Sequence, residues 1–210
     1  MKGQDLLLLL KLVSLERQAQ RAGDRPIDRS PNDWRGWSDF TEERHVAEPL
    51  PLEGVYSVRA LEQETGISKS EVSGALRRCF QSGLAREDRR TGTPTANTKA
   101  LWEVLAFGAR YVFPVSPGPL VSGIPTAAAA PVLAGRLMSA GDTIHVWEDV
   151  RGAARGQRIE PLYRTVPRAV RRDPDLYAML ALVDSIRLGG ERETALARKL
   201  LAERLGRSDG

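Results

Sequence analysis

The sequence predicts a mainly α-helical fold with a minor β component. Apolar residues recur at helical spacing near the N-terminus, over residues 58–84 and in the two segments that close the chain. Alternation typical of a strand is limited to short stretches such as residues 143–147. The chain has 210 residues, of which 41% are hydrophobic and 28% charged, so it can bury a sizeable core in one domain or two small ones.

The first predicted helix covers residues 1–23, and its leucine run at 6–10 predicts a helix that is buried between others. The run resembles the core of a signal peptide, but Asp5 precedes it, Lys11 interrupts it and no small-residue cleavage site follows. It is also shorter than the ~20 residues that a membrane span needs. We therefore expect no export signal, no membrane span and a cytoplasmic protein.

Residues 24–52 predict a long inserted loop, because they are rich in proline and mixed charge and poor in aliphatic residues. Trp34, Trp37 and Phe40 are unusual in such a segment. Two interpretations are open. The aromatic side chains pack onto the domain, or they anchor a partner protein.

Two helical patterns separated by a glycine occupy residues 58–84. Capping and turn residues mark their boundaries: Ser57 before the first helix, Gly66 at the turn, Ser68 with Glu71 as an S-x-x-E capping box for the second helix, and Gly83 followed by Leu84 at its end. The apolar residues between these points fall on one continuous face. Two short helices that cross at a tight turn are expected.

This segment, with the letters LEQETGISKSEVSGALRRCFQSGL, resembles the helix-turn-helix of bacterial winged-helix regulators of the MarR-like kind. The matching residues are Leu61, Gly66, Ile67, Ser68, Val72, Leu76, Gly83 and Leu84. The resemblance covers about residues 57–95, where residues 84–95 could form a short strand and a glycine-containing turn. It implies a winged helix-turn-helix fold and a transcriptional regulator that binds double-stranded DNA sequence-specifically. It also implies a homodimer in which terminal helices pair, reading two half-sites about one helical turn apart.

In such a motif the second helix enters the major groove with its first residues facing the bases. The residues placed there are Lys69, Ser70 and Ser73. Phosphate contacts are expected from the following arginines, namely Arg77, Arg78, Arg86, Arg89 and Arg90. Residues 77–90 hold these five arginines against Glu87 and Asp88, which gives a net charge of +3. The alternative is a structural helical hairpin with a solvated basic face.

A second basic run covers residues 151–172, where seven arginines oppose only Glu160, a net charge of +6. Three roles are open for this run: contact with a polyanion, contact with an acidic protein, or pairing with acids of the closing helices. The acids considered are Asp184, Glu191 and Glu193.

The remaining elements follow from capping, turn and alternation signals. In chain order we expect a helix from Asn97 to about Gly108, a strand at 110–114, irregular structure at 114–131, a short helix at 131–138, a strand at 143–147, a loop at 151–172, and helices at 174–189 and 191–206. The expected division is a winged helix-turn-helix domain at 1–108 and a smaller C-terminal α/β or helical region at 109–210 for dimerisation or partner binding.

The residue types argue against enzymatic and metal chemistry. A single cysteine, Cys79, allows no intramolecular disulfide, and His45 and His145 lie far apart in the chain. None of the familiar catalytic or phosphate-loop motifs occurs in the sequence. We expect no enzyme activity, no cofactor and no metal. The second interpretation of function is an antitoxin-like or adaptor subunit that binds a partner protein through its C-terminal half, and a hydrolase on a winged-helix scaffold is a third.

Overall fold

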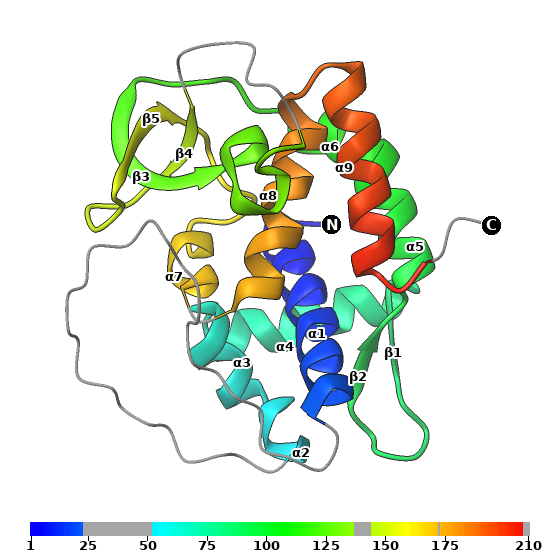
Figure 1. Cartoon of the computed structure of the whole chain (residues 1–210). Coiled ribbons are helices and arrows are strands. Elements are labelled where there is room, and N and C mark those ends of the chain that lie inside the picture. Colours follow the sequence, from blue (N-terminus) through cyan, green and yellow to red (C-terminus); the bar gives the residue numbers. More distant parts are fainter. Residues whose placement is uncertain (23–51, 137–143, 172, 208–210) are drawn as a thin grey trace.

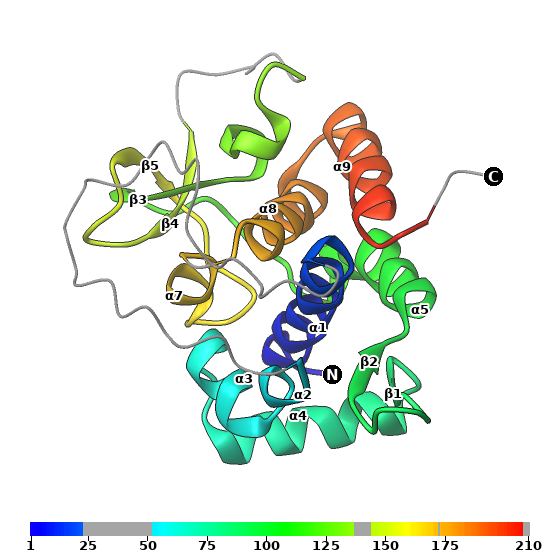
Figure 2. The same ribbon diagram turned by 60° about the horizontal axis from the view of Figure 1, so that its bottom comes forward.

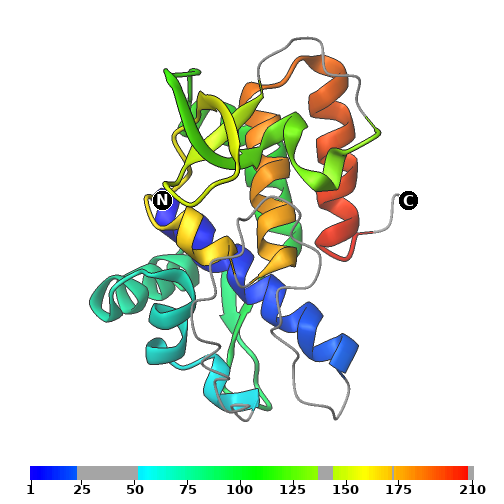
Figure 3. The same cartoon turned by 60° about the vertical axis from the view of Figure 1, so that its left-hand side comes forward.

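Helix α1 (Gly3–Ala22) lies at the centre of the computed structural model, which describes residues 1–22, 52–136, 144–171 and 173–207 (Figure 1). Leu6 to Leu10 have no solvent exposure, which confirms that the leucine run is buried on all sides. Figure 3 shows why: α1 runs between the elements of residues 58–96 on one side and the closing helices on the other. Nearly all of the predicted loop at 24–52, with Trp34, Trp37 and Phe40, lies outside the described residues.

Helices α3 (Val58–Thr65) and α4 (Lys69–Gln81) confirm the two predicted helices, and a short helix, α2 (Leu52–Val55), precedes them. The Ser57 hydroxyl accepts a hydrogen bond from the Ala60 N–H at 3.2 Å, so the first cap is present. Gly66 takes a left-handed conformation with φ 70°, which lets the chain turn sharply between the helices. After α4, Gly83 is left-handed too, and the Leu84 N–H reaches back to the Cys79 carbonyl oxygen at 3.0 Å.

The predicted capping box at α4 is wrong. The Ser68 side chain caps no backbone N–H, and its hydroxyl lies 3.4 Å from that of Ser70. The Glu71 carboxylate instead accepts a hydrogen bond from the Tyr163 hydroxyl at 2.9 Å. Glu71, which the local pattern assigned to the cap, therefore bonds to a residue 92 positions further along the chain.

A two-stranded antiparallel hairpin follows α4, where one short strand and a glycine-containing turn were predicted. Strands β1 (Ala85–Glu87) and β2 (Pro94–Ala96) pair with Arg86 opposite Thr95. Asp88 holds the connecting turn, because its carboxylate accepts from the backbone N–H groups of Arg90 and Thr91, each at 2.9 Å. Figure 2 shows α4 crossing one end of α1, with β1 and β2 beside the end of α4.

A continuous helical run then covers α5 (Thr98–Glu103), a π-helical turn (Val104–Gly108) and α6 (Ala109–Val112). Asn97 caps it as predicted, accepting from the Ala100 N–H at 3.3 Å. The strand expected at 110–114 is absent from this described part of the chain, since the helix continues to Val112. The suggested domain boundary between residues 108 and 109 therefore falls inside a helix.

Strands β3 (Leu120–Thr126), β4 (His145–Glu148) and β5 (Ala154–Arg158) form a small sheet that closes on itself. Strand β3 is antiparallel to both others, and β4 and β5 pair in parallel. Only β4 matches its prediction, because 114–131 was expected to be irregular and 151–172 to be a loop. The short helix expected at 131–138 is reduced to a 3₁₀ turn at Pro131–Leu133 in its described part, and another 3₁₀ turn, Ala127–Ala129, precedes it.

The chain closes with α7 (Val166–Val170), α8 (Pro174–Leu188) and α9 (Glu191–Arg204), of which α7 falls in the predicted loop. Helix α8 is buried along almost its whole length. Asp184 on α8 accepts hydrogen bonds from Trp147 at 2.6 Å and Thr126 at 2.9 Å, which ties the helix to the sheet. One buried apolar cluster joins residues from α1 to α9. The fold is thus mainly helical with a minor β component, as predicted.

Candidate nucleic-acid interface

The first turns of α4 present a polar stripe to solvent. Lys69, Ser70 and Ser73 are all exposed, whereas Val72 and Ala75 on the opposite face are buried. The Lys69 side chain is 60% exposed, and its ammonium group lies 3.8 Å from the Glu62 carboxylate. An exposed pair of this kind is weak and leaves the ammonium group available to another anion.

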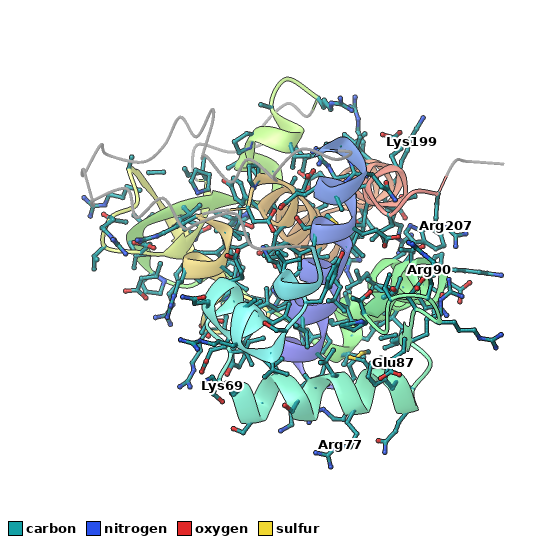
Figure 4. All side chains as sticks on the ribbon, turned by 90° about the horizontal axis from the view of Figure 1, so that it is seen from below. Lys69, Arg77, Glu87, Arg90, Lys199 and Arg207 are labelled. Atoms are coloured by element: carbon teal, nitrogen blue, oxygen red, sulfur yellow. The ribbon has the colours of Figure 1, made fainter. Side chains whose placement is uncertain are left out.

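Arg77 continues this stripe, but Arg78 has a different partner. Arg77 is exposed, and Figure 4 shows it projecting away from the molecule, with Lys69 at the start of the same helix. The Arg78 guanidinium instead forms a bidentate pair with the buried carboxylate of Asp5, through Nε at 3.0 Å and Nη2 at 2.6 Å. This hydrogen-bonded pair raises the pKa of Arg78. Arg78 therefore fastens α4 to the start of α1 rather than standing free for a phosphate.

The β1–β2 hairpin carries the other three arginines predicted to meet phosphate. Arg86, Arg89 and Arg90 are exposed, and Figure 4 shows Arg90 to one side of α4, with Glu87 between. Backbone N–H groups of Thr91 and Arg90 donate to Asp88 and hold the pKa of its carboxyl below the usual value. Of the two acids in residues 77–90, Asp88 thus uses its carboxylate to stabilise the turn of the hairpin.

A segment from the C-terminal half lies against the turn between α3 and α4. Besides the bond from Tyr163 to Glu71, a Cβ on Gly66 would lie 3.1 Å from the Thr165 Cβ and 3.4 Å from the Arg168 Cδ. Arg164 and Arg168 are exposed beside these contacts. Sequence reasoning identified the basic run at 151–172 but not its position next to the start of α4, because no local pattern specifies that packing.

Other arginines of the run have acidic partners of their own. Arg158 Nη1 lies 3.3 Å from the Glu148 carboxylate, and Arg171 Nη2 lies 2.6 Å from that of Asp149. The acids of the closing helices are used elsewhere: Asp184 pairs with Arg187 at 2.6 Å, and Glu193 accepts from the Gly190 N–H at 3.1 Å. Arg158 and Arg171 of the run thus pair with the end of β4 and the turn that follows it.

The described part of this surface carries neither an exposed cysteine nor a candidate metal site. Cys79, the one cysteine near it, is buried, and burial raises the pKa of its thiol to about 12. The described residues contain no group of three or more His, Cys, Asp and Glu side chains placed to hold a metal ion. None of the helices in the described ranges has the length and apolar character that a membrane crossing requires. No protein-family model, curated protein or solved structure matches the chain.

Proposed function

We propose that the chain is a winged helix-turn-helix protein that binds double-stranded DNA and regulates transcription. Helices α3 and α4 are the helix-turn-helix, and the β1–β2 hairpin is its short wing. The observation that carries the proposal is the exposed polar stripe of α4, bordered by hairpin arginines. A helix fits the major groove, which is about 12 Å wide, and the groove edges offer donors and acceptors that such side chains read.

Each residue has a distinct role in this proposal. Lys69 reaches acceptor atoms of guanine, and Ser70 and Ser73 hydrogen-bond to neighbouring base edges. The phosphate contacts come from the exposed arginines of the surface: Arg77, Arg86, Arg89 and Arg90, with Arg164 and Arg168 on the other flank of α4. Arg78 is left out, because its guanidinium holds Asp5.

The test is a binding experiment in two steps. Genomic fragments, including the region upstream of the chain's own gene, are first selected by the purified protein in the presence of competitor DNA. Fluorescence anisotropy over a salt series then compares Lys69→Ala with Arg89→Ala. Lys69→Ala should cut discrimination between selected and scrambled DNA by about 1–3 kcal/mol, whereas Arg89→Ala should weaken all sequences alike and lower the salt slope by about one unit.

Lys199→Ala is the matched control, because this exposed lysine lies on α9, away from α4 (Figure 4). It should leave both the discrimination and the salt slope unchanged. Equal effects of Lys69→Ala and Arg89→Ala on every sequence would contradict the assigned roles. If no fragment is preferred and weak binding disappears near physiological salt, the DNA proposal fails.

A second function, pairing with another protein chain, is favoured by an exposed apolar surface on the helical run. Phe107 is 54%, Tyr111 79% and Val112 55% exposed. Helix α8 is buried within the chain and is unavailable for pairing. We propose that this surface, rather than α8, joins two copies into the dimer that a two-fold DNA site requires.

Sedimentation equilibrium tests the dimer. Tyr111→Ser should shift the protein toward a monomer, and Val150→Ser, which changes a 95% exposed residue at the far sheet, should not. A wild-type monomer at all concentrations would contradict self-pairing. A different protein that co-purifies stoichiometrically, and is lost with Tyr111→Ser, would identify the surface as that of an adaptor instead.

A further inference from the structure

A cavity of about 250 Å³ lies between the C-terminal ends of α1 and α9 and the chain after the Pro131–Leu133 turn. Four of its lining residues are arginines, Arg17, Arg21, Arg136 and Arg204, and they come from three separate segments. Glu203 is the one acid among the lining residues. This concentration of guanidinium groups around a hollow differs from the scattered arginines of a solvated surface.

A single buried carboxylate, that of Asp175, serves three of these arginines. Its oxygens lie 2.7 Å from Arg21 Nη1 and 3.2 Å from Arg204 Nη1. Arg17 Nε is 3.6 Å away, beyond hydrogen-bonding distance, and it is buried without an acceptor in the described part of the chain. A buried donor of this kind is costly unless a further acceptor reaches it.

Within the part of the chain that the structure describes, the positive charge around the cavity exceeds the negative charge of the nearby acids. Burial lowers the pKa of Arg204, the Asp175 carboxylate opposes this, and Arg17, Arg21 and Arg136 lower the pKa further by repulsion. Among the described residues, the four arginines together with Asp175 and Glu203 give a local charge of +2. Within the described ranges Arg136 forms no ion pair. No ion pair therefore accounts for the position of its side chain beside the cavity.

We propose that this cavity binds a small phosphorylated molecule through its phosphate or diphosphate group. Guanidinium groups offer paired donors that match phosphate oxygens, and a phosphate would supply the negative charge that the described residues around the cavity lack. The volume lies below the range of about 300–1,000 Å³ usual for drug-sized ligands, so the ligand is small. The less exposed Arg17 and Arg204, at 25% and 29%, would contact the anion deepest, and the more exposed Arg21 and Arg136 would contact it nearer to solvent.

The cavity is separate from the proposed DNA surface. Helix α1 begins at α4, where Asp5 holds Arg78, and reaches the cavity at Arg21. These sixteen steps along a helix correspond to about 24 Å. Phosphate bound in the cavity would therefore not compete for the stripe on α4, and the inference does not depend on the DNA proposal.

Isothermal titration with pyrophosphate tests the site, with sodium chloride of matched ionic strength as reference. We expect saturable binding of one pyrophosphate and a rise in the thermal unfolding midpoint. Arg136→Gln should weaken the binding at least tenfold, and this variant should fold because Arg136 is exposed. Arg21→Gln, a second variant at a 60% exposed side chain, should have a similar effect.

Two controls locate the site. Arg192→Gln, at an exposed arginine of α9 outside the cavity, and Lys69→Ala on α4 should both leave pyrophosphate binding unchanged. The absence of saturable binding, or equal weakening by Arg136→Gln and Arg192→Gln, would overturn the proposal. Weakening by Lys69→Ala alone would place the bound anion at α4 and would overturn it as well, while leaving the DNA proposal intact.

Discussion

At the scale of single residues, the buried ion network around Lys11 is where we expect a substitution to lower the free energy of unfolding strongly. Lys11 is 1% exposed, and its ammonium group lies 2.8 Å from Asp173 and 3.0 Å from Glu64. Asp173 also accepts from the Ser14 hydroxyl at 2.6 Å and caps α8 at the Leu176 N–H. The lysine that interrupts the leucine run is thus the point where α1, α3 and α8 are joined.

Asp173→Ala should lower the free energy of unfolding by about 3–5 kcal/mol, because it leaves a buried ammonium group short of a partner. Urea denaturation measures the change, with the exposed Glu87→Ala as control. Burial lowers the pKa of Lys11, but Asp173 and Glu64 outweigh it, so the pKa lies above the usual 10.5. The stabilisation is therefore complete below pH 10.5 and lost only as pH rises through the folded pKa. A loss of this stabilisation between pH 6 and 9 would contradict the assignment.

Cys79 should be nearly inert toward thiol reagents in the folded protein. Burial raises the pKa of the thiol to about 12, and Asp5 raises it as well. At pH 8 this corresponds to a thiolate fraction on the order of one in ten thousand. Absorbance during reaction with a disulfide reagent should show a much slower rate than for the same chain in urea. Rapid reaction of the native protein would instead indicate a thiol open to redox chemistry.

The residue scale also shows where sequence reasoning about the site stops. Exposure of Lys69, Ser70, Ser73 and the hairpin arginines follows from helical spacing and turn position, which are local. Arg78 lies on the same helix, yet its partner, Asp5, is 73 residues away. Local spacing indicates which side chains face outward, but it does not reveal a carboxylate that tertiary packing brings to them.

At the scale of elements, Gly66 and Gly83 provide a matched pair of substitutions. Both are left-handed, with φ 70° and 71°, so a side chain at either is strained. A Cβ on Gly66 would also lie 3.1 Å from Thr165, whereas a Cβ on Gly83 would meet nothing within 4 Å. Gly83→Ala should cost about 1–2 kcal/mol, and Gly66→Ala about 1 kcal/mol more from crowding. Thermal and urea unfolding measure both. Equal losses of unfolding free energy for the two variants would show that Thr165 does not crowd a side chain at position 66.

Elements with local signals were predicted and elements made by tertiary contact were not. The caps at Ser57 and Asn97 need only a neighbouring N–H. Strand β3 depends on Gly123, where a Cβ would lie 2.0 Å from the Trp147 carbonyl oxygen, so its glycine marks close pairing rather than a loop. Tyr111 and Val112 have strand-forming side chains, but no strand pairs with them in the described structure, and the Arg110 guanidinium donates to the Gly189 carbonyl oxygen from a helix.

At the scale of the whole molecule, α1 couples the stability of residues 1–108 to that of residues 109–210, because it packs against elements of both. One end of it packs on α4 and β2, and it also packs on α8 from the C-terminal half. The helical run across residue 108 and the contact of Tyr163 with Glu71 add two further connections. A division of the chain at residue 108 would expose the leucine run and remove Asp173 from Lys11.

The two halves should therefore unfold together. Urea denaturation followed by far-ultraviolet circular dichroism, which reports all helices, should give the same midpoint as fluorescence, to which the buried Trp147 contributes. The reason is that α1 cannot keep its buried face once either half is lost. In Trp147→Phe the fluorescence of the remaining tryptophans is followed instead. This variant tests whether the fluorescence midpoint depends on Trp147 alone. Two separate transitions, with helical signal retained after Trp147 becomes exposed, would show that residues 1–108 hold their structure alone and that the sheet half is an independent unit.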